Sequence, residues 1–220
     1  MRRIFIWILC FCLAMPVYGA EEKYVALTFD DGPSGRYTRA LLDGLEKRGV
    51  KATFLLCGYR LKEYPREAKR ICALGHEIGL HGYSHADMSK LGQEALEREL
   101  ADTMALLPKG CRPVFLRPPG GKYNDTVLEA ARQADLAVLQ WSVDPKDWAS
   151  HDAAAIEKAV TETVRSGDVI LLHDMSDSSV KAALAIVDEL TKQGFRFVTA
   201  SELARRKSVE ITAGKVYRRF

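Results

Sequence analysis

The 220-residue sequence has little net charge, few histidines and no low-complexity tract. A formal net charge of +3 is too small to indicate a nucleic-acid-binding protein. A disordered chain is poor in apolar residues and strongly charged, whereas 47% of these residues are hydrophobic. No linker or internal repeat divides the chain, whose length suits a single domain, commonly about 100–200 residues. These absences indicate one globular domain.

The beginning of the chain has the pattern of a secretory signal peptide, residues 1–19. Arg2 and Arg3 precede an unbroken apolar run over residues 4–17, and Val17 and Gly19 place small residues before a cleavage site. A membrane span needs roughly 20 residues, so an uncleaved anchor is the less favoured alternative. Cleavage removes two arginines and lowers the net charge from +3 to +1. We therefore predict an extracytoplasmic protein, secreted or held in a bacterial cell envelope.

The cysteines that remain after cleavage are few. Cys57, Cys72 and Cys111 form an odd set that permits at most one disulfide in the oxidising compartment that export implies. Cys57 and Cys72 lie within apolar patterns and are predicted to be core residues. No metal site built on cysteine is indicated.

Seven short apolar segments alternate with amphipathic stretches along the rest of the chain. This order predicts a parallel sheet with helices between its strands, either a (β/α) barrel or an open doubly wound sheet. No Gly-x-Gly-x-x-Gly follows the first segment, so a dinucleotide-binding fold lacks its phosphate loop. We divide the chain into the signal peptide (1–19), one domain (20–207) and a short, loosely held C-terminal tail (208–220). The predicted strands are 24–29, 52–57, 77–80, 113–117, 136–143, 169–173 and 195–199.

Amphipathic patterns predict the helices between these strands. One ends at Gly49, and the others cover 66–74, 94–107, 125–134, 152–164 and 179–192. Asp152 and Ser201 are residue types that favour the N-cap position, and we expect each to cap a helix.

Polar residues gather where five of the predicted strands end. Because parallel α/β folds place their active sites at the carboxyl ends of the strands, this coincidence predicts one functional site. Three of the five histidines belong to these clusters, whereas His76 and His151 have no companions and are expected to be ordinary polar residues. The clusters are 28–33 (Thr-Phe-Asp-Asp-Gly-Pro), 81–85 (His-Gly-Tyr-Ser-His), 117–121 (Arg-Pro-Pro-Gly-Gly), 144–148 (Asp-Pro-Lys-Asp-Trp) and 173–174 (His-Asp).

Two of these clusters suggest a metal site. Asp30 and Asp31 follow an apolar strand, where one carboxylate needs a cation, although the pair also suits a simple turn. The i, i+4 spacing of His81 and His85 predicts that both lie on one side of a helical turn. Pairs of metal-binding histidines have this spacing, and so do histidine pairs on protein surfaces that bind no metal. One aspartate with two histidines matches a catalytic zinc site, and equally the facial triad of non-haem iron enzymes. His-Glu-x-x-His is absent, so the second aspartate is the nearest general base.

Together the five clusters resemble, in order and type, the motifs of the NodB-homology polysaccharide deacetylases, carbohydrate esterase family 4. The resemblance extends from Tyr24 to Arg205. It implies an α/β fold, a distorted (β/α) barrel of seven or eight units in a single domain. It also implies a hydrolase that cleaves the amide C–N bond of N-acetyl groups on an amino-sugar polymer and releases acetate. The implied cofactor is Zn²⁺ or another divalent metal such as Co²⁺, Ni²⁺ or Mn²⁺.

The resemblance also implies roles for the residues of the metal site. Asp30 becomes the general base, held in place by Arg117. Asp31, His81 and His85 become the metal ligands. The implied attack on the acetyl carbonyl is metal-assisted, with Asp30 accepting the proton of the water.

Further roles follow for the groove that receives the sugar. His173 becomes the general acid, paired with Asp147, and Trp148 forms a wall of the groove. Ile170 and Leu172 are expected to line the pocket for the acetyl methyl group. Two positions depart from the common pattern: Gly120 stands where an aromatic is frequent, and Gly82 where Ser or Thr is frequent. The backbone N–H of Gly120 still serves as oxyanion donor, and Tyr123 is a candidate for the missing ring.

The substrate is the least specified part of the prediction. Peptidoglycan, at its GlcNAc or MurNAc residues, is preferred, with chitin oligosaccharides or an exopolysaccharide as alternatives. A non-catalytic glycan-binding protein on the same fold, an iron-dependent oxygenase and an enzyme for a small cyclic imide are the rival classes. We expect a monomer whose partner is the N-acetylated glycan, with no nucleic acid and no membrane partner unless the leader is retained as an anchor.

Overall fold

The computed structural model describes residues 22–220. The predicted signal peptide, residues 1–19, lies outside the described residues. Within the described range, no helix is long and apolar enough to cross a membrane.

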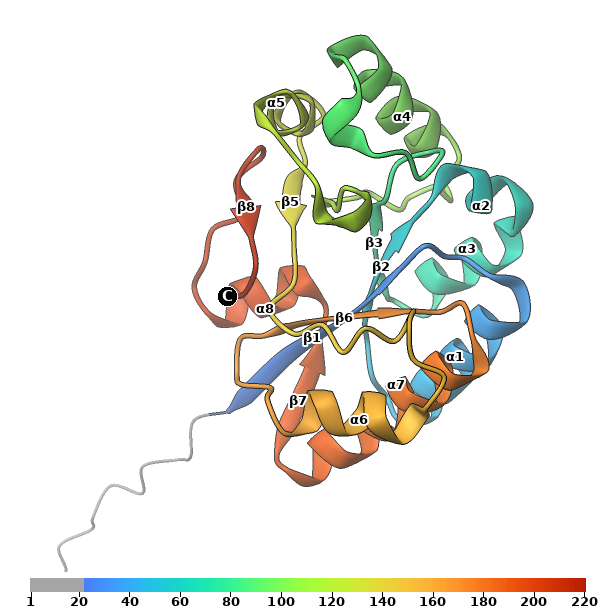
Figure 1. The fold of residues 1–220 in the computed structure, drawn as a ribbon, viewed down its shortest axis with the longest axis vertical. Coiled ribbons are helices and arrows are strands. Elements are labelled where there is room, and N and C mark those ends of the chain that lie inside the picture. Colours follow the sequence, from blue (N-terminus) through green and yellow to red (C-terminus); the bar gives the residue numbers. More distant parts are fainter. Residues whose placement is uncertain (1–21) are drawn as a thin grey trace, which may run out of the picture.

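Strands and helices alternate along the described chain (Figure 1). The strands are β1 (Lys23–Asp30), β2 (Thr53–Leu56), β3 (Glu77–Leu80), β4 (Phe115–Leu116), β5 (Ala137–Leu139), β6 (Val169–His173), β7 (Phe195–Val198) and β8 (Val216–Tyr217). The helices are α1 (Gly35–Lys47), α2 (Gly58–Glu63), α3 (Pro65–Ala73), α4 (Gln93–Ala105), α5 (Asp125–Gln133), α6 (Ala153–Thr161), α7 (Asp177–Lys192) and α8 (Ala200–Arg206). Two 3₁₀ turns, Met88–Lys90 and Pro119–Gly121, complete the set.

The strands form one parallel sheet that curls into a distorted barrel. Its order is β6-β1-β2-β3-β4-β5-β8, and β7 pairs with the first half of β1. A bridge between Val143 and Ile170 joins the segment after β5 to β6, so the sheet returns toward its starting strand. The predicted distorted barrel in one domain is therefore confirmed, and each of the seven predicted strands is present.

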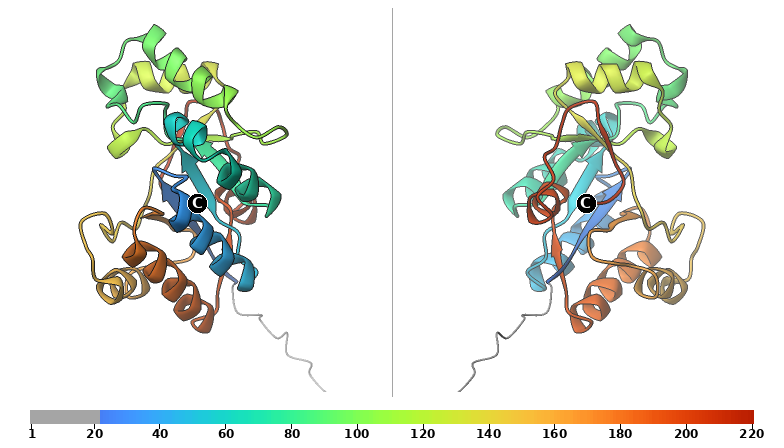
Figure 2. Two further views of the ribbon diagram at one scale, coloured as in Figure 1. Left: turned by 90° about the vertical axis from the view of Figure 1, so that its right-hand side faces the viewer. Right: turned by 90° about the vertical axis from the view of Figure 1, so that its left-hand side faces the viewer.

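The C-terminal segment differs from the prediction. Residues 208–220 were expected to be loosely held, but Val216 and Tyr217 form β8 and pair with β5. Arg219 makes a bridge to Asp168 next to β6, and Figures 1 and 2 show the segment lying against the barrel beside α8. The expectation of a loose tail is wrong because this short segment completes the sheet beyond β5.

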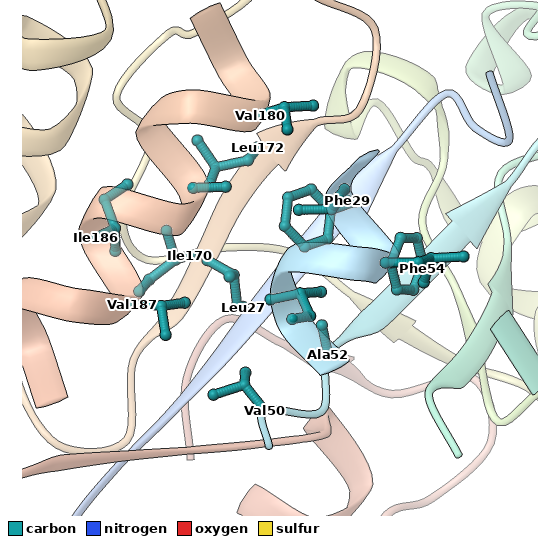
Figure 3. Close-up of a cluster of buried hydrophobic side chains, with 14 of the residues drawn as sticks. Leu27, Phe29, Val50, Ala52, Phe54, Ile170, Leu172, Val180, Ile186 and Val187 are labelled. Carbon is teal, nitrogen blue, oxygen red and sulfur yellow. The ribbon is translucent and has the colours of Figure 1, made fainter. Parts of the chain in front are cut away.

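A layer of buried side chains joins the sheet to the helices that cover it. Leu27 and Phe29 of β1 and Ile170 and Leu172 of β6 pack toward α7 (Figure 3). The parallel register pairs Leu27 with Ile170 and Phe29 with Leu172, so these four side chains share the helix-facing side of the sheet. The intervening residues, among them Asp30, point to the other side. The register thus decides which residues reach the interior of the barrel.

Side-chain caps fix where α6 and α8 begin. The Asp152 carboxylate accepts the N–H groups of Ala154 and Ala155 at the start of α6, which confirms the predicted cap. Ser201 is not a cap, because Thr199 accepts the Glu202 N–H instead and Ser201 lies within α8.

A disulfide joins Cys72, in the last turn of α3, to Cys111, in the loop before β4. The prediction that Cys72 is a plain core residue is therefore wrong, whereas Cys57 is buried and unpaired as expected. Nothing in the sequence pairs Cys72 with Cys111, because 39 residues separate them and only the fold brings them together.

Candidate metal centre and active site

Three of the predicted ligands converge at the carboxyl ends of β1 and β3. Asp31 Oδ1 lies 3.2 Å from His81 Nε2 and 3.0 Å from His85 Nε2, and the three ligand atoms lie within 4.8 Å of one another. Asp31 Oδ1 is buried and accepts no hydrogen bond. A buried carboxylate oxygen without a donor, faced by two imidazole nitrogens, suits a metal ion with further positions open to substrate or water.

The charge of Asp31 also fits a metal ligand. Burial raises the pKa of Asp31, but the close imidazoles of His81 and His85 lower it more, and the pKa lies well below its usual range. The carboxyl group is therefore anionic at neutral pH. His81 is oriented from behind, since its Nδ1 lies 2.6 Å from the backbone oxygen of Arg117. With the proton on Nδ1, Nε2 is free to bind a metal.

The backbone at two of these ligands is unusual. Asp31 has φ 70° and His85 has φ 61°, both in the left-handed region that non-glycine residues rarely adopt. Residues 81–85 do not form the helical turn that their spacing predicted, but a loop in which Gly82 also has a positive φ, 78°. The loop, rather than a helix face, brings the two imidazoles together.

Asp30, the neighbour of Asp31, is held by a buried guanidinium. Arg117 Nη1 donates to Asp30 Oδ1 at 2.6 Å and to Thr28 Oγ1 at 2.9 Å. Its Nε and Nη2 donate to the backbone oxygens of Leu139 and Gln140. Arg117 is fully buried, so all of its bonds lie inside the barrel. The predicted contact between Arg117 and Asp30 is present.

His173 and Asp147 form a second buried pair at the end of β6. His173 Nδ1 lies 2.8 Å from Asp147 Oδ1, and the His173 backbone N–H donates to Asp147 Oδ2. Burial lowers the pKa of His173, but the hydrogen bond to Asp147 and the nearby Asp30 carboxylate outweigh this effect and raise the pKa to about 9. The imidazole is therefore protonated at neutral pH, with Nε2 4.0 Å from Asp31 Oδ2.

Asp30, His173 and the three candidate metal ligands line one pocket. Trp148, with 65% of its surface exposed, and Gly120 form parts of its wall. The full lining is Asp30, Asp31, His81, His85, Gly120, Trp141, Asp144, Trp148, Leu171 and His173.

The apolar part of the pocket differs from the prediction. Ile170 and Leu172 are in the helix-facing core rather than the pocket, as Figure 3 shows. Leu171 lines the pocket instead, because the register pairs it with Thr28 and sets it one residue out of phase with Ile170.

The aromatic expected beside Gly120 also comes from another residue. Tyr123 packs against the cluster under α5 and is not part of the pocket lining. Trp141, from the segment after β5, lines the pocket, and the Arg117 guanidinium lies 5.7 Å from its ring centroid. A Cβ at Gly121 would come within 2.8 Å of the Trp141 ring, so a glycine at position 121 leaves room for the indole.

Comparison with known proteins gives the family. Residues 18–139 match the family model described as polysaccharide deacetylase. A peptidoglycan-N-acetylglucosamine deacetylase of Bacillus cereus is 42% identical over 193 residues, 85% of this chain and 91% of that protein. The chain belongs to the polysaccharide deacetylase family.

Other members of the polysaccharide deacetylase family differ in what their names say they act on. A chitooligosaccharide deacetylase of Sinorhizobium fredii is 34% identical over 82% of this chain and 92% of that protein. A family 4 acetyl xylan esterase of Clostridium thermocellum, solved with a cobalt ion, matches with a TM-score of 0.83 at 34% identity, over 90% of this chain and 98% of that one.

The structure adds three residues to the pocket of this polysaccharide deacetylase that the sequence did not indicate. The sequence does not single out Trp141 and Leu171, because they lie inside predicted strands, where apolar residues need no functional explanation. Asp144 lay within a predicted polar cluster but was given no role, and it lines the pocket beside the tryptophans. The alternation of faces along β6 is the signal that would have found Leu171.

Proposed function

We propose that the protein is an exported peptidoglycan N-deacetylase, which hydrolyses the N-acetyl groups of GlcNAc or MurNAc residues and releases acetate. The observation that carries the proposal is one pocket in which the Asp31–His81–His85 triad lies beside the Asp30–Arg117 and His173–Asp147 pairs. The Bacillus cereus relative supports the choice of glycan.

The triad is the proposed site of a divalent metal. A metal at these ligands supplies Lewis-acid activation of water and of the acetyl carbonyl. Zn²⁺ is our first choice because one carboxylate and two imidazoles are ligands that it favours in catalytic sites. Co²⁺, Ni²⁺ and Mn²⁺ are alternatives, and the cobalt in the Clostridium thermocellum esterase supports the wider class.

Asp30 is the proposed general base. Its Oδ1 is occupied by Arg117, whereas its Oδ2 lies 3.9 Å from His81 Nε2 and so faces the metal ligands. That oxygen is placed to accept a proton from a water in the site. Arg117 acts as a positioning residue, because its four hydrogen bonds fix the carboxylate to the barrel interior.

His173 is the proposed general acid for the leaving amine. Asp147 holds Nδ1, so the proton on Nε2 is the one available to the pocket. The backbone N–H of Gly120, in the pocket wall, is our candidate donor to the tetrahedral oxyanion. Leu171 offers an apolar surface for the acetyl methyl group, while Trp141 and Trp148 offer flat faces for sugar rings.

The proposal also covers the organisation and location of the whole chain. A signal peptide over 1–19 and a monomeric state are proposed, together with a domain over 20–207 whose sheet the segment 208–220 completes. Secretion or retention in the cell envelope is supported by the disulfide between Cys72 and Cys111, which persists in oxidising compartments.

A chitin oligosaccharide is the second candidate substrate, because the Sinorhizobium fredii relative shares 34% identity with this chain. A non-catalytic glycan-binding role is disfavoured, since the general base, the general acid and the metal ligands are all present in one pocket.

Acetate release from purified peptidoglycan and from chitin oligomers tests the proposal. The metal-loaded protein is expected to release acetate from peptidoglycan and to leave free amino sugars in it. Faster release from chitin oligomers than from peptidoglycan would favour the second candidate. No release from any N-acetylated glycan would contradict the assignment as a deacetylase.

A further inference from the structure

One carboxylate outside the pocket contacts the loop that carries both histidine ligands. Glu99 lies on α4, and its Oε2 accepts the backbone N–H groups of Tyr83 at 2.6 Å and Ser84 at 2.9 Å. Its Oε1 accepts the Ser84 hydroxyl at 2.6 Å. All three donors belong to the residues between His81 and His85. Hydrogen bonds to a charged acceptor are the stronger kind, so this is a firm attachment of the loop to α4.

The loop is held from the opposite side through its carbonyl groups. The N–H of Gly58, at the start of α2, donates to the Gly82 oxygen at 2.9 Å, and the next N–H donates to the Tyr83 oxygen at 3.0 Å. The donors of the loop thus go to Glu99 on α4 and its acceptors to α2. A carboxylate suits the position of Glu99, because its two oxygens can accept hydrogen bonds from two adjacent N–H groups and a hydroxyl at the same time.

The conformation that needs this support is strained. His85 has φ 61°, a conformation that costs a non-glycine residue free energy and persists only when surrounding contacts enforce it. Glu99 binds the residue directly before it, Ser84, by both its N–H and its hydroxyl. We expect the backbone to relax and the His85 imidazole to turn away from Asp31 when these bonds are removed.

Gly82 explains why the carboxylate of Glu99 can come so close. A Cβ at this position would lie 3.1 Å from Glu99 Oε2 and 2.6 Å from Met88 Cε. Any side chain at position 82 would therefore crowd these two groups. The space beside it is taken by the Glu99 carboxylate and the methyl group of Met88.

We infer that Glu99 is a positioning residue of the metal centre, which sets metal affinity by holding the loop that carries His81 and His85. The inference rests on the proposed metal-dependent function. Residues behind metal ligands typically change metal affinity by roughly 10–100-fold when mutated. We expect a loss of that size in Glu99→Ala, with turnover recovering when excess metal is added and KM for the glycan unchanged.

The test measures the Zn²⁺ dissociation constant of the full chain by competition with a chromophoric chelator. Metal-free wild type, Glu99→Ala and the control Glu97→Ala are compared, with circular dichroism to show that each is folded. Glu97 lies exposed on the same helix and accepts a hydrogen bond from Gln93, so Glu97→Ala makes the same chemical change away from the loop. The absorption spectrum of the Co²⁺ form reports the ligand geometry independently of activity.

A Kd raised by roughly 10-fold or more in Glu99→Ala, with Glu97→Ala unchanged, supports the inference. A Glu99→Ala affinity within a factor of two of wild type overturns it. If Glu99→Ala does not fold, Glu99→Gln decides: a weaker affinity supports the role and an unchanged one overturns it. If wild type itself does not bind metal, both the proposed function and this inference are contradicted. The wild-type titration comes first, so this result is distinguished from a loss of affinity that is confined to Glu99→Ala.

Discussion

At the scale of single residues, the site consists of buried charges that are each balanced by a partner. Arg117 has no exposed surface and Asp30 only 3%, and an isolated charge at such positions is costly. Asp147 is equally buried and balances the protonated His173. The same pairs that carry the proposed chemistry therefore also bear on stability, because losing one partner leaves the other buried and unpaired.

Arg117→Ala is expected to lower the free energy of unfolding by about 3–5 kcal/mol, the usual result of breaking a buried ion pair. Urea denaturation of the metal-free protein measures it. Arg98→Ala is the matched control, because Arg98 pairs with Glu94 on the exposed surface of α4, and such pairs contribute at most about 1 kcal/mol. Equal losses in the two variants would contradict the role given to the buried pair.

Asp147→Asn is expected to shift the pH dependence of kcat/KM. His173, with its pKa raised to about 9, is protonated at neutral pH, and a general acid loses activity as pH rises through its pKa. The amide removes the negative charge that favours the imidazolium, so the pKa falls and the alkaline limb of the profile moves to lower pH. An alkaline limb at the same pH in wild type and variant would exclude His173 as the group that titrates.

The sequence was sufficient for the metal ligands and for the two charged pairs of the site, and insufficient for Asp144 and for the apolar residues of the pocket. Asp31, His81 and His85 were predictable because polar side chains at strand ends need a reason to be there. Leu171 and Trp141 were not, because an apolar residue near a strand fits the core equally well. The alternation of faces along β6 separates Leu171 from Leu172, and the register, which pairs Leu171 with Thr28, shows which of the two faces the barrel interior.

At the scale of elements, the sequence predicts the long strands better than it predicts the short strands and the loops between them. The strands of five or more residues were predicted well because their apolar runs are continuous, as in β1 and β6. β8 is two residues long and was missed, since Val216 and Tyr217 make no apolar run that stands out from a tail. The turn at His81–His85 was predicted as helical because i, i+4 spacing alone does not report a positive φ.

Removing the disulfide is expected to destabilise the domain without removing the site. The bond joins α3 to the loop before β4 across 39 residues, and such bridges contribute about 2–4 kcal/mol. Urea denaturation should give the Cys72→Ser/Cys111→Ser variant a lower midpoint than oxidised wild type. Reduced wild type should match the variant, and adding reductant to the variant should change nothing. A variant as stable as oxidised wild type would contradict the bridge.

At the scale of the whole molecule, the barrel brings β1, β3 and β6 together so that groups from distant parts of the chain share one pocket. Asp31, His85 and His173 lie far apart in the sequence. They nevertheless meet at the rim of the barrel, where the carboxyl ends of the strands lie. The order of motifs predicted this meeting, because strands of a parallel sheet place their ends on the same side. The pairing of β8 could not be predicted, since it depends on a short segment without a pattern of its own. Val143 lies in a predicted strand, but its sequence does not say that it bridges to Ile170.

Metal binding is expected to stabilise the folded domain. A ligand that binds only the native state adds about 2.7 kcal/mol at a free concentration one hundred times its Kd. Thermal unfolding with Zn²⁺ should therefore show a higher Tm than with chelator. Asp31→Ala, which lacks one ligand, should show little difference between the two conditions. A Tm of wild type that does not respond to metal would contradict the assignment of the triad.

The most direct test of the account compares acetate release from peptidoglycan by wild type and Asp30→Asn, with Zn²⁺ affinity measured for both. The account predicts that both bind Zn²⁺ with similar affinity, because Asp30 is not a ligand, and that the variant releases acetate at least about 10²-fold more slowly. Equal rates of acetate release by the two proteins, at equal metal loading, would contradict it.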